Sequence, residues 1–456
     1  MTELAERTDV LEEMQRVPSI RTELPGTLAR QHVAFDHRYT SPSLPRAYPI
    51  VPVRGWGAAV EDIDGNVFLD FTAGIAVSAT GYNHPRITEA IERQARELIH
   101  FSASDFYLPV YAKLAAELAR IAPIDGPARV FIGNSGTEAV EAAIKLARFA
   151  TRRQYLVAFV GGFHGRSYGA VSLTASKSKY HAGFGPLLPG VLHVPFGNAG
   201  LDELENRLFK RLVPADEVAA IVVEPIQGEG GYVIPEDDFL ARLRAICDAN
   251  GILMVADEVQ SGAGRTGTFW AVDHWGVKPD IVAVAKGIAS GMPLGAMIAR
   301  EDLMTTWGKG HHGSTFGGNA ISCAVALETI ALLEEGLMHN AADRGEQALA
   351  GLRPLVGRHG DLVRDVRGKG LMIGVQFDSG RTAEAVQWAS FKRGLLVLEA
   401  GDDVVRMSPP LVVDEGNVET AVRIFSQAVA DVAADPHGIY AEALRWEKPD
   451  EGEVDG

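Results

Sequence analysis

A lysine and an aspartate at the ends of apolar runs are the residues of this sequence best suited to chemistry. Asp257 ends the run 252–257, and Lys286 comes directly after the run 281–285. Short apolar runs bounded by turn residues are typical of strands in a buried parallel sheet, and ligands bind at the carboxyl ends of such strands. The two runs therefore bring a carboxylate and an amine to one crevice.

An amine and a carboxylate in one crevice match two requirements that pyridoxal 5'-phosphate (PLP) places on a protein. A lysine amine can form a Schiff base with the aldehyde of the cofactor, and a carboxylate can hold the pyridine nitrogen in its protonated form. The alternative is a surface lysine and a surface aspartate at strand ends. A lysine is seldom buried unless it is paired or functional, and the two residues alone leave both interpretations open.

The segment from Asn134 to Glu138 has the pattern of a turn and a helix start that could bind phosphate. Ser135 and Glu138 fit the capping box S-x-x-E, and Gly136 lacks a side chain that would keep a ligand from the backbone. The free amides and the positive dipole end of a helix N-terminus attract an anion. An ordinary capped helix is the alternative.

Two more loops follow apolar runs and carry aromatic or charged side chains. Phe163 or His164 could stack on a planar ring, although such a pair is also common in loop packing. Arg166 could bind a substrate carboxylate through a bidentate pair, or be a solvated cation. Glu224 and Glu229 lie in a glycine-rich loop and suggest acid–base chemistry. A metal site is disfavoured because no histidine or cysteine accompanies them locally.

The segment 262–267 matches the pattern G-x-G-x-x-G of dinucleotide-binding proteins. That pattern needs a helix to open at the third glycine, but β-branched and aromatic residues follow instead, which favours a tight loop beside Asp257. An NAD-dependent oxidoreductase is therefore the alternative from another class of protein, and a PLP-binding regulator without turnover is a third. The segment 312–319 precedes an apolar helix and offers a second place for an anion.

Composition and charge argue against several classes of protein. The chain has 456 residues, 46% of them hydrophobic and 22% charged, and its formal net charge of −16 argues against a main role in binding nucleic acid or an anionic membrane. Its two cysteines, Cys247 and Cys323, lie far apart, which suggests neither a disulfide framework nor a zinc site. The sequence shows no leader pattern and no apolar run of membrane-spanning length, so we expect a cytoplasmic protein.

Seven apolar runs between about residues 125 and 300 alternate with helical patterns. This alternation predicts an α/β protein whose large domain contains a mainly parallel, seven-stranded sheet with helices on both faces. The predicted strands are 129–132, 156–160, 191–195, 219–223, 252–257, 281–285 and 296–299. Beyond residue 335, short strands at 371–377, 395–398 and 404–407 and a helix at 416–434 indicate a second, smaller α/β domain.

The ends of the chain have a different composition. Residues 1 to about 50 are rich in proline, arginine and threonine and predict an extended arm, followed by a hairpin around Asp64-Gly65 and a helix at about 85–100. We expect four regions along the chain. They are an N-terminal arm with a small-domain segment at 1–75, a large PLP-binding domain at 76–335, a C-terminal small domain at 336–445 and a disordered acidic tail at 446–456.

Taken in order, these motifs resemble those of the class III (ω-) aminotransferases, which are PLP enzymes of fold type I. Within that family the sequence most resembles the 4-aminobutyrate aminotransferases, from about Gly55 to about Leu411. The motifs that carry the resemblance are Asn134-Ser135-Gly136-Thr137-Glu138-Ala139, Phe163-His164-Gly165-Arg166, Glu224-Pro225-Ile226-Gln227-Gly228-Glu229-Gly230-Gly231, Asp257-Glu258-Val259-Gln260, Ala285-Lys286-Gly287 and Ser314-Thr315-Phe316-Gly317-Gly318-Asn319.

The resemblance implies PLP-dependent transamination between an ω-amino acid and 2-oxoglutarate. The donor would be of the 4-aminobutyrate or ornithine type, and the ping-pong half-reactions would pass through an internal aldimine on Lys286. A homodimer or a tetramer is implied as well. The segment 101–107, where the family lines its substrate pocket, departs from the 4-aminobutyrate pattern and leaves the donor open. A PLP-dependent amino-acid racemase of the same fold is the alternative, because racemisation needs the same lysine and cofactor.

The resemblance also assigns roles to residues at matching positions. Lys286, Asp257 and Glu229 would be catalytic, with Asp257 paired to the pyridine nitrogen. Glu229 would mask Arg406 for one substrate and free it for the α-carboxylate of 2-oxoglutarate or glutamate. The substrate site would comprise Ile75, Arg166, Glu229 and Arg406. The cofactor would be bound by Ser135, Gly136, Thr137, Phe163, His164, Glu224, Asp257, Val259, Gln260 and Lys286, with Thr315 contributed by the neighbouring subunit. No metal is expected.

Overall fold

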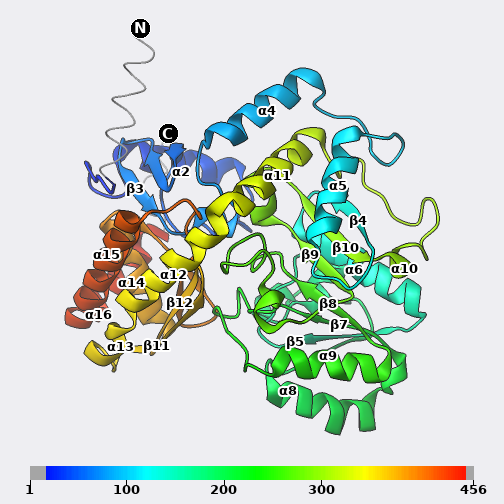
Figure 1. Cartoon of the computed structure of the whole chain (residues 1–456). Helices are drawn as coiled ribbons and strands as arrows, with labels where there is room; N and C mark the ends of the chain where they lie inside the picture. Colours follow the sequence, from blue (N-terminus) through cyan, green and yellow to red (C-terminus); the bar gives the residue numbers. More distant parts are fainter. Residues whose placement is uncertain (1–16, 448–456) are drawn as a thin grey trace.

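The computed structural model describes residues 17–447, which form one large and two smaller sheets with helices packed on them (Figure 1). Residues 1–16 of the predicted arm and residues 448–456 of the predicted tail lie outside the described residues. Within residues 17–447, no helix has the length and apolar character needed to cross a membrane.

The large sheet contains all seven strands that the sequence predicts. In spatial order they are β4 (Ala128–Gly133), β10 (Gly295–Arg300), β9 (Ile281–Val284), β8 (Leu253–Asp257), β7 (Val218–Val223), β5 (Tyr155–Phe159) and β6 (Val191–Val194). The strands from β9 to β6 are parallel, whereas β10 runs antiparallel to both of its neighbours. The prediction of a mainly parallel sheet is confirmed.

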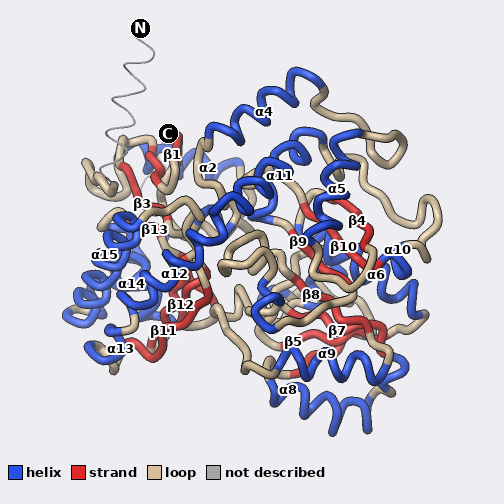
Figure 2. Tube along the Cα trace, in the orientation of Figure 1, coloured by secondary structure: helices blue, strands red, loops and turns tan. Residues whose placement is uncertain are grey.

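The helices lie around these strands (Figure 2). In chain order they are α2 (Thr27–Tyr39), α3 (Ala73–Ala76), α4 (Pro85–Glu97), α5 (Pro109–Ile121), α6 (Gly136–Thr151), α7 (Tyr168–Leu173), α8 (Asn198–Glu203), α9 (Phe239–Asn250), α10 (Glu301–Met304), α11 (Ala320–Leu332), α12 (Met338–Leu352), α13 (Pro354–Arg358), α14 (Gly380–Lys392), α15 (Glu415–Ala434) and α16 (Pro436–Glu447). A short 3₁₀ turn, η5 (Lys286–Ala289), begins at the predicted Schiff-base lysine.

Helices cover both faces of the large sheet because alternate side chains of each strand point to opposite sides. On one face, Val222 of β7 belongs to the same hydrophobic cluster as Ala143 of α6. On the other face, Val223 of β7 belongs to the same cluster as Leu243 of α9. β7 is buried along its whole length, and this burial on both faces explains why its sequence is a continuous apolar run.

One of the two smaller sheets joins the N-terminal and C-terminal parts of the chain, and the other contains C-terminal strands alone. One has the order β1-β2-β3-β13 and the other the order β11-β12-β15-β14. Their strands are β1 (Pro52–Trp56), β2 (Ala59–Asp62), β3 (Val67–Asp70), β11 (Val363–Lys369), β12 (Met372–Phe377), β13 (Leu395–Leu396), β14 (Leu398–Ala400) and β15 (Val404–Met407). β13 pairs in parallel with β3, where Leu395 lies opposite Leu69. This pairing fastens the segment before the large sheet to the C-terminal part of the chain.

The smaller elements agree with the sequence in most places. β2 and β3 form the predicted hairpin around Asp64-Gly65, and α15 matches the predicted helix at 416–434. The structure adds β11, which the sequence does not reveal because charged residues interrupt its valines. Side-chain alternation is therefore a weak signal for a strand that is only partly buried.

The predicted extended arm is wrong for residues 27–39, which form the helix α2. The residue before this helix provides no side-chain cap, and the cap comes instead from Asp64 in the hairpin turn. The carboxylate of Asp64 accepts hydrogen bonds from the amides of Leu28 at 2.9 Å and Ala29 at 2.8 Å. Because the capping residue lies 35 positions beyond Ala29, the local sequence of the helix does not show it.

The glycine-rich segment 262–267 forms consecutive turns, and no helix opens at Gly267. Arg265 in this segment is buried, and its guanidinium donates to the carbonyl oxygens of Leu371 and Pro409. The segment is therefore a tight loop that contacts the C-terminal part of the chain. It lacks the helix start of a dinucleotide-binding turn, which removes the main argument for an oxidoreductase.

Candidate active site

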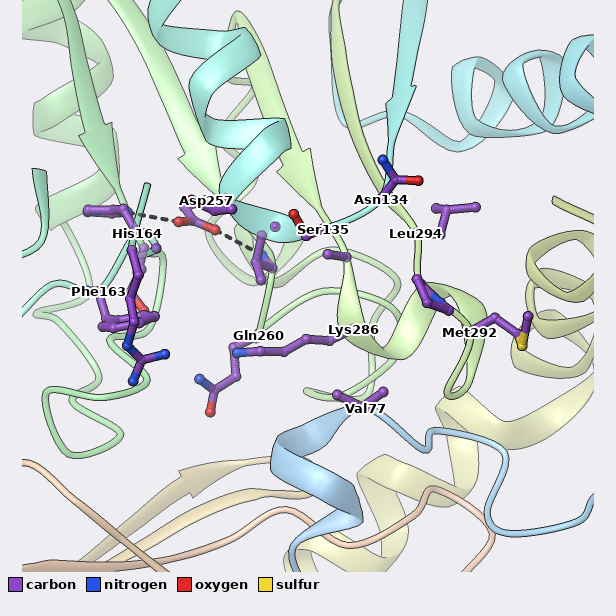
Figure 3. Close-up of a pocket in the computed structure, with 18 of the residues that line it drawn as sticks. Val77, Asn134, Ser135, Phe163, His164, Asp257, Gln260, Lys286, Met292 and Leu294 are labelled. Atoms are coloured by element: carbon purple, nitrogen blue, oxygen red, sulfur yellow. Dashed lines mark hydrogen bonds and ion pairs between the residues drawn. The ribbon is translucent and has the colours of Figure 1, made fainter. Parts of the chain in front are cut away.

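A cavity of about 410 Å³ lies at the carboxyl ends of β8 and β9. Figure 3 shows side chains from several loops around it. Parallel strands end at the same edge of a sheet, so residues far apart in the sequence meet there. The predicted residues that line the cavity are Ser135, Gly136, Thr137, Phe163, His164, Arg166, Glu224, Asp257, Val259, Gln260 and Lys286. The lining residues that the predictions omit include Val77, Asn134, Met292 and Leu294.

Lys286 lies directly after β9, and its backbone φ of 51° is in the left-handed region that few residues other than glycine adopt. Within residues 17–447, its amine has no hydrogen bond or ion pair. Burial lowers the pKa of the amine and the charge of Arg406 lowers it further, while Glu229, Asp257 and Glu224 oppose the shift. The lowered pKa increases the fraction of neutral amine, which is the form that attacks an aldehyde.

A buried hydrogen bond joins His164 to Asp257. Nδ1 of His164 lies 2.8 Å from Oδ2 of Asp257, and the amide of Val259 donates to Oδ1 at 3.0 Å. Burial by itself would lower the pKa of His164, but the hydrogen bond and charge of Asp257, together with the charge of Glu224, raise it. Both oxygens of the Asp257 carboxylate thus have a partner, which holds the side chain in place.

Glu224 holds two loops of the site together. Its Oε2 accepts from the amide of Phe163 at 3.0 Å, and its Oε1 accepts from the amide of Gly228 at 3.0 Å. Burial raises the pKa of Glu224 to about 7. The sequence suggests that Glu224 and Glu229 act together, but the structure gives the two carboxylates different partners.

The N-terminus of α6 borders the cavity, with Ser135 as its cap. Oγ of Ser135 accepts from the amide of Glu138 at 3.4 Å. The other half of the predicted capping box is wrong, because the carboxylate of Glu138 accepts from the amide of Asn134 at 2.6 Å. A Cβ at Gly136 would lie 2.7 Å from a methyl group of Val259, so only glycine lets this turn approach so closely. Amides of the first turn have no partner within the helix and suit an anion.

The hydroxyl of Thr137 is already engaged within the protein. It lies 2.6 Å from Oγ of Ser167, which in turn donates to the carboxylate of Glu141 at 2.5 Å. The same carboxylate accepts from two amides in the first turn of α7. These contacts tie the loop before α7 to α6, and they leave the backbone amide of Thr137, rather than its hydroxyl, for an anion.

Arg406 on β15 forms an ion pair with Glu229 close to Lys286, and the side chains of the pair are only 6% and 20% exposed. Burial would raise the pKa of Glu229, but the charge and hydrogen bond of Arg406 lower it overall. Nε of Arg406 is buried without a hydrogen-bond partner among the described residues. Glu229 therefore covers a guanidinium whose Nε–H group can still donate a hydrogen bond.

The loop that carries Glu229 is held from the C-terminal part of the chain. Arg367 on β11 donates to the carbonyl oxygen of Gly231 at 2.7 Å, and the amide of Gly401 donates to the carbonyl oxygen of Glu229 at 2.6 Å. Arg406 belongs to the same sheet as Arg367. The backbones of both charged partners are thus fixed relative to each other, and a rotation of the Glu229 side chain is enough to separate the charges.

Arg166 is exposed and lies near two aromatic rings. Its Cζ is 5.1 Å from the ring centre of Phe163 and 5.2 Å from that of Tyr180, distances at which a cation is attracted to a ring. Lys177 lies near Glu229, because its charge helps to lower the pKa of that carboxyl. The predictions include neither Tyr180 nor Lys177, because a loop residue shows no periodicity from which its neighbours could be inferred.

Four predicted residues do not line the cavity of this chain. They are Glu229 and Arg406, whose ion pair is described above, and Thr315 and Ile75. Thr315 is exposed in the loop before α11, next to Phe316, which is 62% exposed. Ile75 is 47% exposed on the short turn α3. The residue of that segment that does line the cavity is Val77, two positions further along.

The turn α3 is left-handed. Ala73, Gly74, Ile75 and Ala76 have φ values of 47°, 62°, 69° and 58°. A left-handed helical conformation costs each L-residue roughly 1–2 kcal/mol, because Cβ then crowds the following carbonyl oxygen. Three of these four residues are not glycine, so the turn stores strain beside the cavity.

The fold and this site have counterparts among known proteins. The family model for aminotransferase class-III matches residues 41–429. The acetylornithine aminotransferase of Methanopyrus kandleri is 43% identical over 383 residues, which cover 84% of this chain and 95% of that protein. The alanine/serine racemase of Pyrococcus horikoshii is 36% identical over 447 residues, which cover 92% and 94%. A structure of the ornithine aminotransferase from Toxoplasma gondii, with PLP at partial occupancy in its active site, covers 90% of this chain and 95% of that chain, with a TM-score of 0.82 and 31% identity.

The fold and the site define a PLP-dependent enzyme of fold type I. The chain belongs to the class-III aminotransferases, since the family model matches most of its length, and the predicted family is confirmed. The residues present fit the cofactor. The amine of Lys286, the buried carboxylate of Asp257 and the first-turn amides of α6 face one cavity, as an aldehyde, a pyridine nitrogen and a phosphate require.

Proposed function

We propose that this enzyme transfers the terminal amino group of an ornithine-type ω-amino acid, such as ornithine or N-acetylornithine, to 2-oxoglutarate. The observation that carries this proposal is the buried ion pair between Arg406 and Glu229 close to Lys286. A guanidinium that a carboxylate covers can bind the carboxylate of one substrate and be hidden from another. The acetylornithine and ornithine aminotransferases among the relatives support a donor of this type over a 4-aminobutyrate-type donor.

Bound PLP supplies an aldehyde for the Schiff base and a protonated ring that accepts electrons when a bond at the donor carbon breaks. We assign the covalent attachment to Lys286, because its lowered pKa favours the neutral amine. Nζ of Lys286 would then take the proton from the donor carbon that bears the amino group and deliver it to the former aldehyde carbon of the bound group within the same half-reaction. The second half-reaction would move a proton between the same two positions in the opposite direction. One residue therefore serves both half-reactions.

The other residues around the cavity would hold the cofactor in place. Asp257, held by its hydrogen bond to His164, would face the pyridine nitrogen. Phe163 and Val259 would bound the two faces of the ring. Gln260, whose Oε1 accepts from the hydroxyl of Tyr232 at 2.9 Å, would approach the phenolic oxygen with its amide nitrogen. Ser135, Gly136 and Thr137 would bind the phosphate, and Glu224 would fix the surrounding loops.

The two substrates would use the basic residues differently. While the ω-amino donor is bound, Glu229 covers Arg406, and Arg166 is available for the distal carboxylate, since no ion pair engages it within residues 17–447. For 2-oxoglutarate, the side chain of Glu229 rotates away and Arg406 binds the α-carboxylate. Ile75 would contact the carbon chain of the substrate from the turn α3.

We further propose that two copies of the chain form a homodimer, in which Thr315 of each copy reaches the phosphate site of the other. Thr315 is exposed and does not line the cavity of its own chain. Its neighbour Ser314 accepts a hydrogen bond from Nδ2 of Asn134 at 3.1 Å. The loop is thus held next to the helix start at one cavity while Thr315 faces outward.

A panel of donors and acceptors on the purified holoenzyme tests the reaction. We expect glutamate to form from 2-oxoglutarate with ornithine or N-acetylornithine, at a kcat/KM at least about tenfold above that for 4-aminobutyrate. A difference of one or two chemical groups between substrates typically changes kcat/KM by about this factor. Absence of glutamate with every ω-amino donor would disprove the proposal.

An amino-acid racemase of the same fold is the second candidate. The alanine/serine racemase that shares 36% identity over 92% of this chain favours it. Racemisation needs the same lysine and differs only in the face to which the proton returns. Incubation with L-alanine or L-serine without an oxo acid separates the two. A racemase accumulates the D-isomer steadily, whereas an aminotransferase stops after one equivalent of bound cofactor is converted.

A further inference from the structure

The left-handed turn α3 has a buried anchor, Asp70, which ends β3 and is 1% exposed. Its Oδ1 accepts from the amide of Thr72 at 2.8 Å, and its Oδ2 accepts from the amide of Ala73 at 2.9 Å. The hydroxyl of Tyr82 donates to Oδ2 at 2.6 Å. Two of these hydrogen bonds come from the backbone that enters the turn.

A second contact holds the turn from the C-terminal part of the chain. The amide of Ser408 donates to the carbonyl oxygen of Phe71 at 2.8 Å, and its hydroxyl donates to the carbonyl oxygen of Thr72 at 3.3 Å. Ser408 is two residues beyond Arg406, so the strand with the substrate-binding arginine also supports this turn. The start of the turn is thus held from β3 on one side and from the end of β15 on the other.

The turn forms part of the cavity wall. Val77, the residue that follows it, lines the cavity, and in Figure 3 it is drawn on the opposite side of Lys286 from Asp257. A left-handed backbone directs its Cβ atoms differently from a right-handed one, so relaxation of the turn would move the side chains at positions 75 and 77. Consecutive L-residues keep such a conformation only where their surroundings enforce it.

We propose that Asp70 is a positioning residue for the amino donor. Its carboxylate holds residues 73–76 in the strained turn, and the turn places Val77, which follows it, as an apolar wall against the carbon chain of the donor. This inference rests on the proposed function, because it concerns the choice among ω-amino donors. Weakening the anchor changes which donors react before it changes how the cofactor binds.

The variant Asp70→Asn tests the anchor, because it keeps the shape of the side chain but replaces one acceptor oxygen by a donor. Tyr82→Phe is the matched control, since it removes the third hydrogen bond and leaves both amide contacts. The measurements are kcat/KM for the two best donors of the wild-type enzyme and the dissociation constant of PLP from the apoenzyme.

In Asp70→Asn we expect the ratio of the two kcat/KM values to change at least about tenfold, while the dissociation constant of PLP stays within about twofold. In Tyr82→Phe both quantities stay within about twofold. An unchanged donor ratio in Asp70→Asn overturns the inference, and so does an equal loss for both donors with weaker PLP binding, which indicates a structural role only. Failure of the proposed function itself would show in the wild-type panel, before any variant is made.

Melting temperatures of the apoenzyme test the strain without any activity measurement. Ile75→Gly and Ile75→Ala remove the same exposed side chain, but only glycine adopts the left-handed conformation freely. We expect the glycine variant to melt above the alanine variant, and this difference to shrink when both are combined with Asp70→Asn, because the two sites are coupled through the turn. A glycine variant that melts at or below the alanine variant overturns the inference, even if Asp70→Asn alone does not fold.

Discussion

His164 and Asp257 are hydrogen-bonded at 2.8 Å although they lie 93 positions apart, and their side chains are 1% and 3% exposed. His164 follows β5 and Asp257 ends β8, so the contact crosses the edge of the sheet at which the cavity lies. It holds the buried carboxylate in place at that edge. This position makes the buried aspartate suitable for a protonated pyridine nitrogen.

Replacement of Lys286 by alanine should leave PLP bound only non-covalently. We expect kcat to fall at least about 10³-fold, because the variant loses both the attachment point and the group that moves the proton. Steady-state assays measure the loss, and intact mass after borohydride reduction shows whether the cofactor is attached. Lys179→Ala, at an exposed lysine, is the control and should keep its turnover. Near-normal turnover in Lys286→Ala would rule out the assigned mechanism.

Replacement of Arg406 by alanine should separate the two half-reactions. We expect the reaction with 2-oxoglutarate to slow roughly 10²-fold more than the reaction with the ω-amino donor. The reason is that only 2-oxoglutarate binds to the guanidinium, which Glu229 covers while the donor is bound. Single-turnover absorbance changes of the bound cofactor measure each half-reaction. Glu229→Gln, which uncovers Arg406, should instead improve glutamate as a donor. Equal losses in both half-reactions of Arg406→Ala would contradict the switch.

Glu258 should make the stability of the protein depend on pH. Its carboxyl is fully buried, and burial raises its pKa from 4.5 to about 7. Between these values the folded protein retains a proton that the unfolded chain loses, so the free energy of unfolding falls as pH rises through this window. The full effect is about 3 kcal/mol.

Urea denaturation of wild type and Glu258→Gln at pH 5 and pH 7.5, at equal protein concentration, measures this contribution. The glutamine variant cannot ionise, so its stability should fall less between the two pH values than that of the wild type. Identical pH dependences would show that Glu258 does not titrate in this window.

Replacement of Gly136 by alanine should weaken cofactor binding. The added Cβ would lie 2.7 Å from Val259, so either the helix start or the side chain of Val259 has to move. We expect the dissociation constant of PLP to rise about tenfold, a typical cost of overpacking. Gly357→Ala is the control, because a Cβ there meets nothing within 4 Å. Fluorescence titration of the apoenzymes compares them, and an unchanged constant for Gly136→Ala would argue against this helix start as the phosphate site.

Much of the candidate site is readable from the sequence because parallel strands deliver their last residues to one edge. Asp257, His164 and Lys286 each follow a buried strand, and the apolar runs that mark those strands are local signals. Lys177 and Tyr180 have no such signal, since they lie beyond α7 in a loop and the short 3₁₀ turn that follows it, whose course depends on contacts with the rest of the protein. Prediction from sequence therefore works for residues in or close behind a strand end and misses Lys177 and Tyr180, which lie further along the chain.

By itself, the sequence determined the seven strands of the large sheet, the polar residues that end them and the class of cofactor, because these are encoded in short segments of the chain. Only the tertiary structure decided which distant residues act on one another. It pairs Glu229 with Arg406, caps α2 with Asp64 and holds the left-handed turn α3 with Asp70. In each of these contacts the local sequence around a side chain does not determine its partner. The partner is determined by how the whole chain packs.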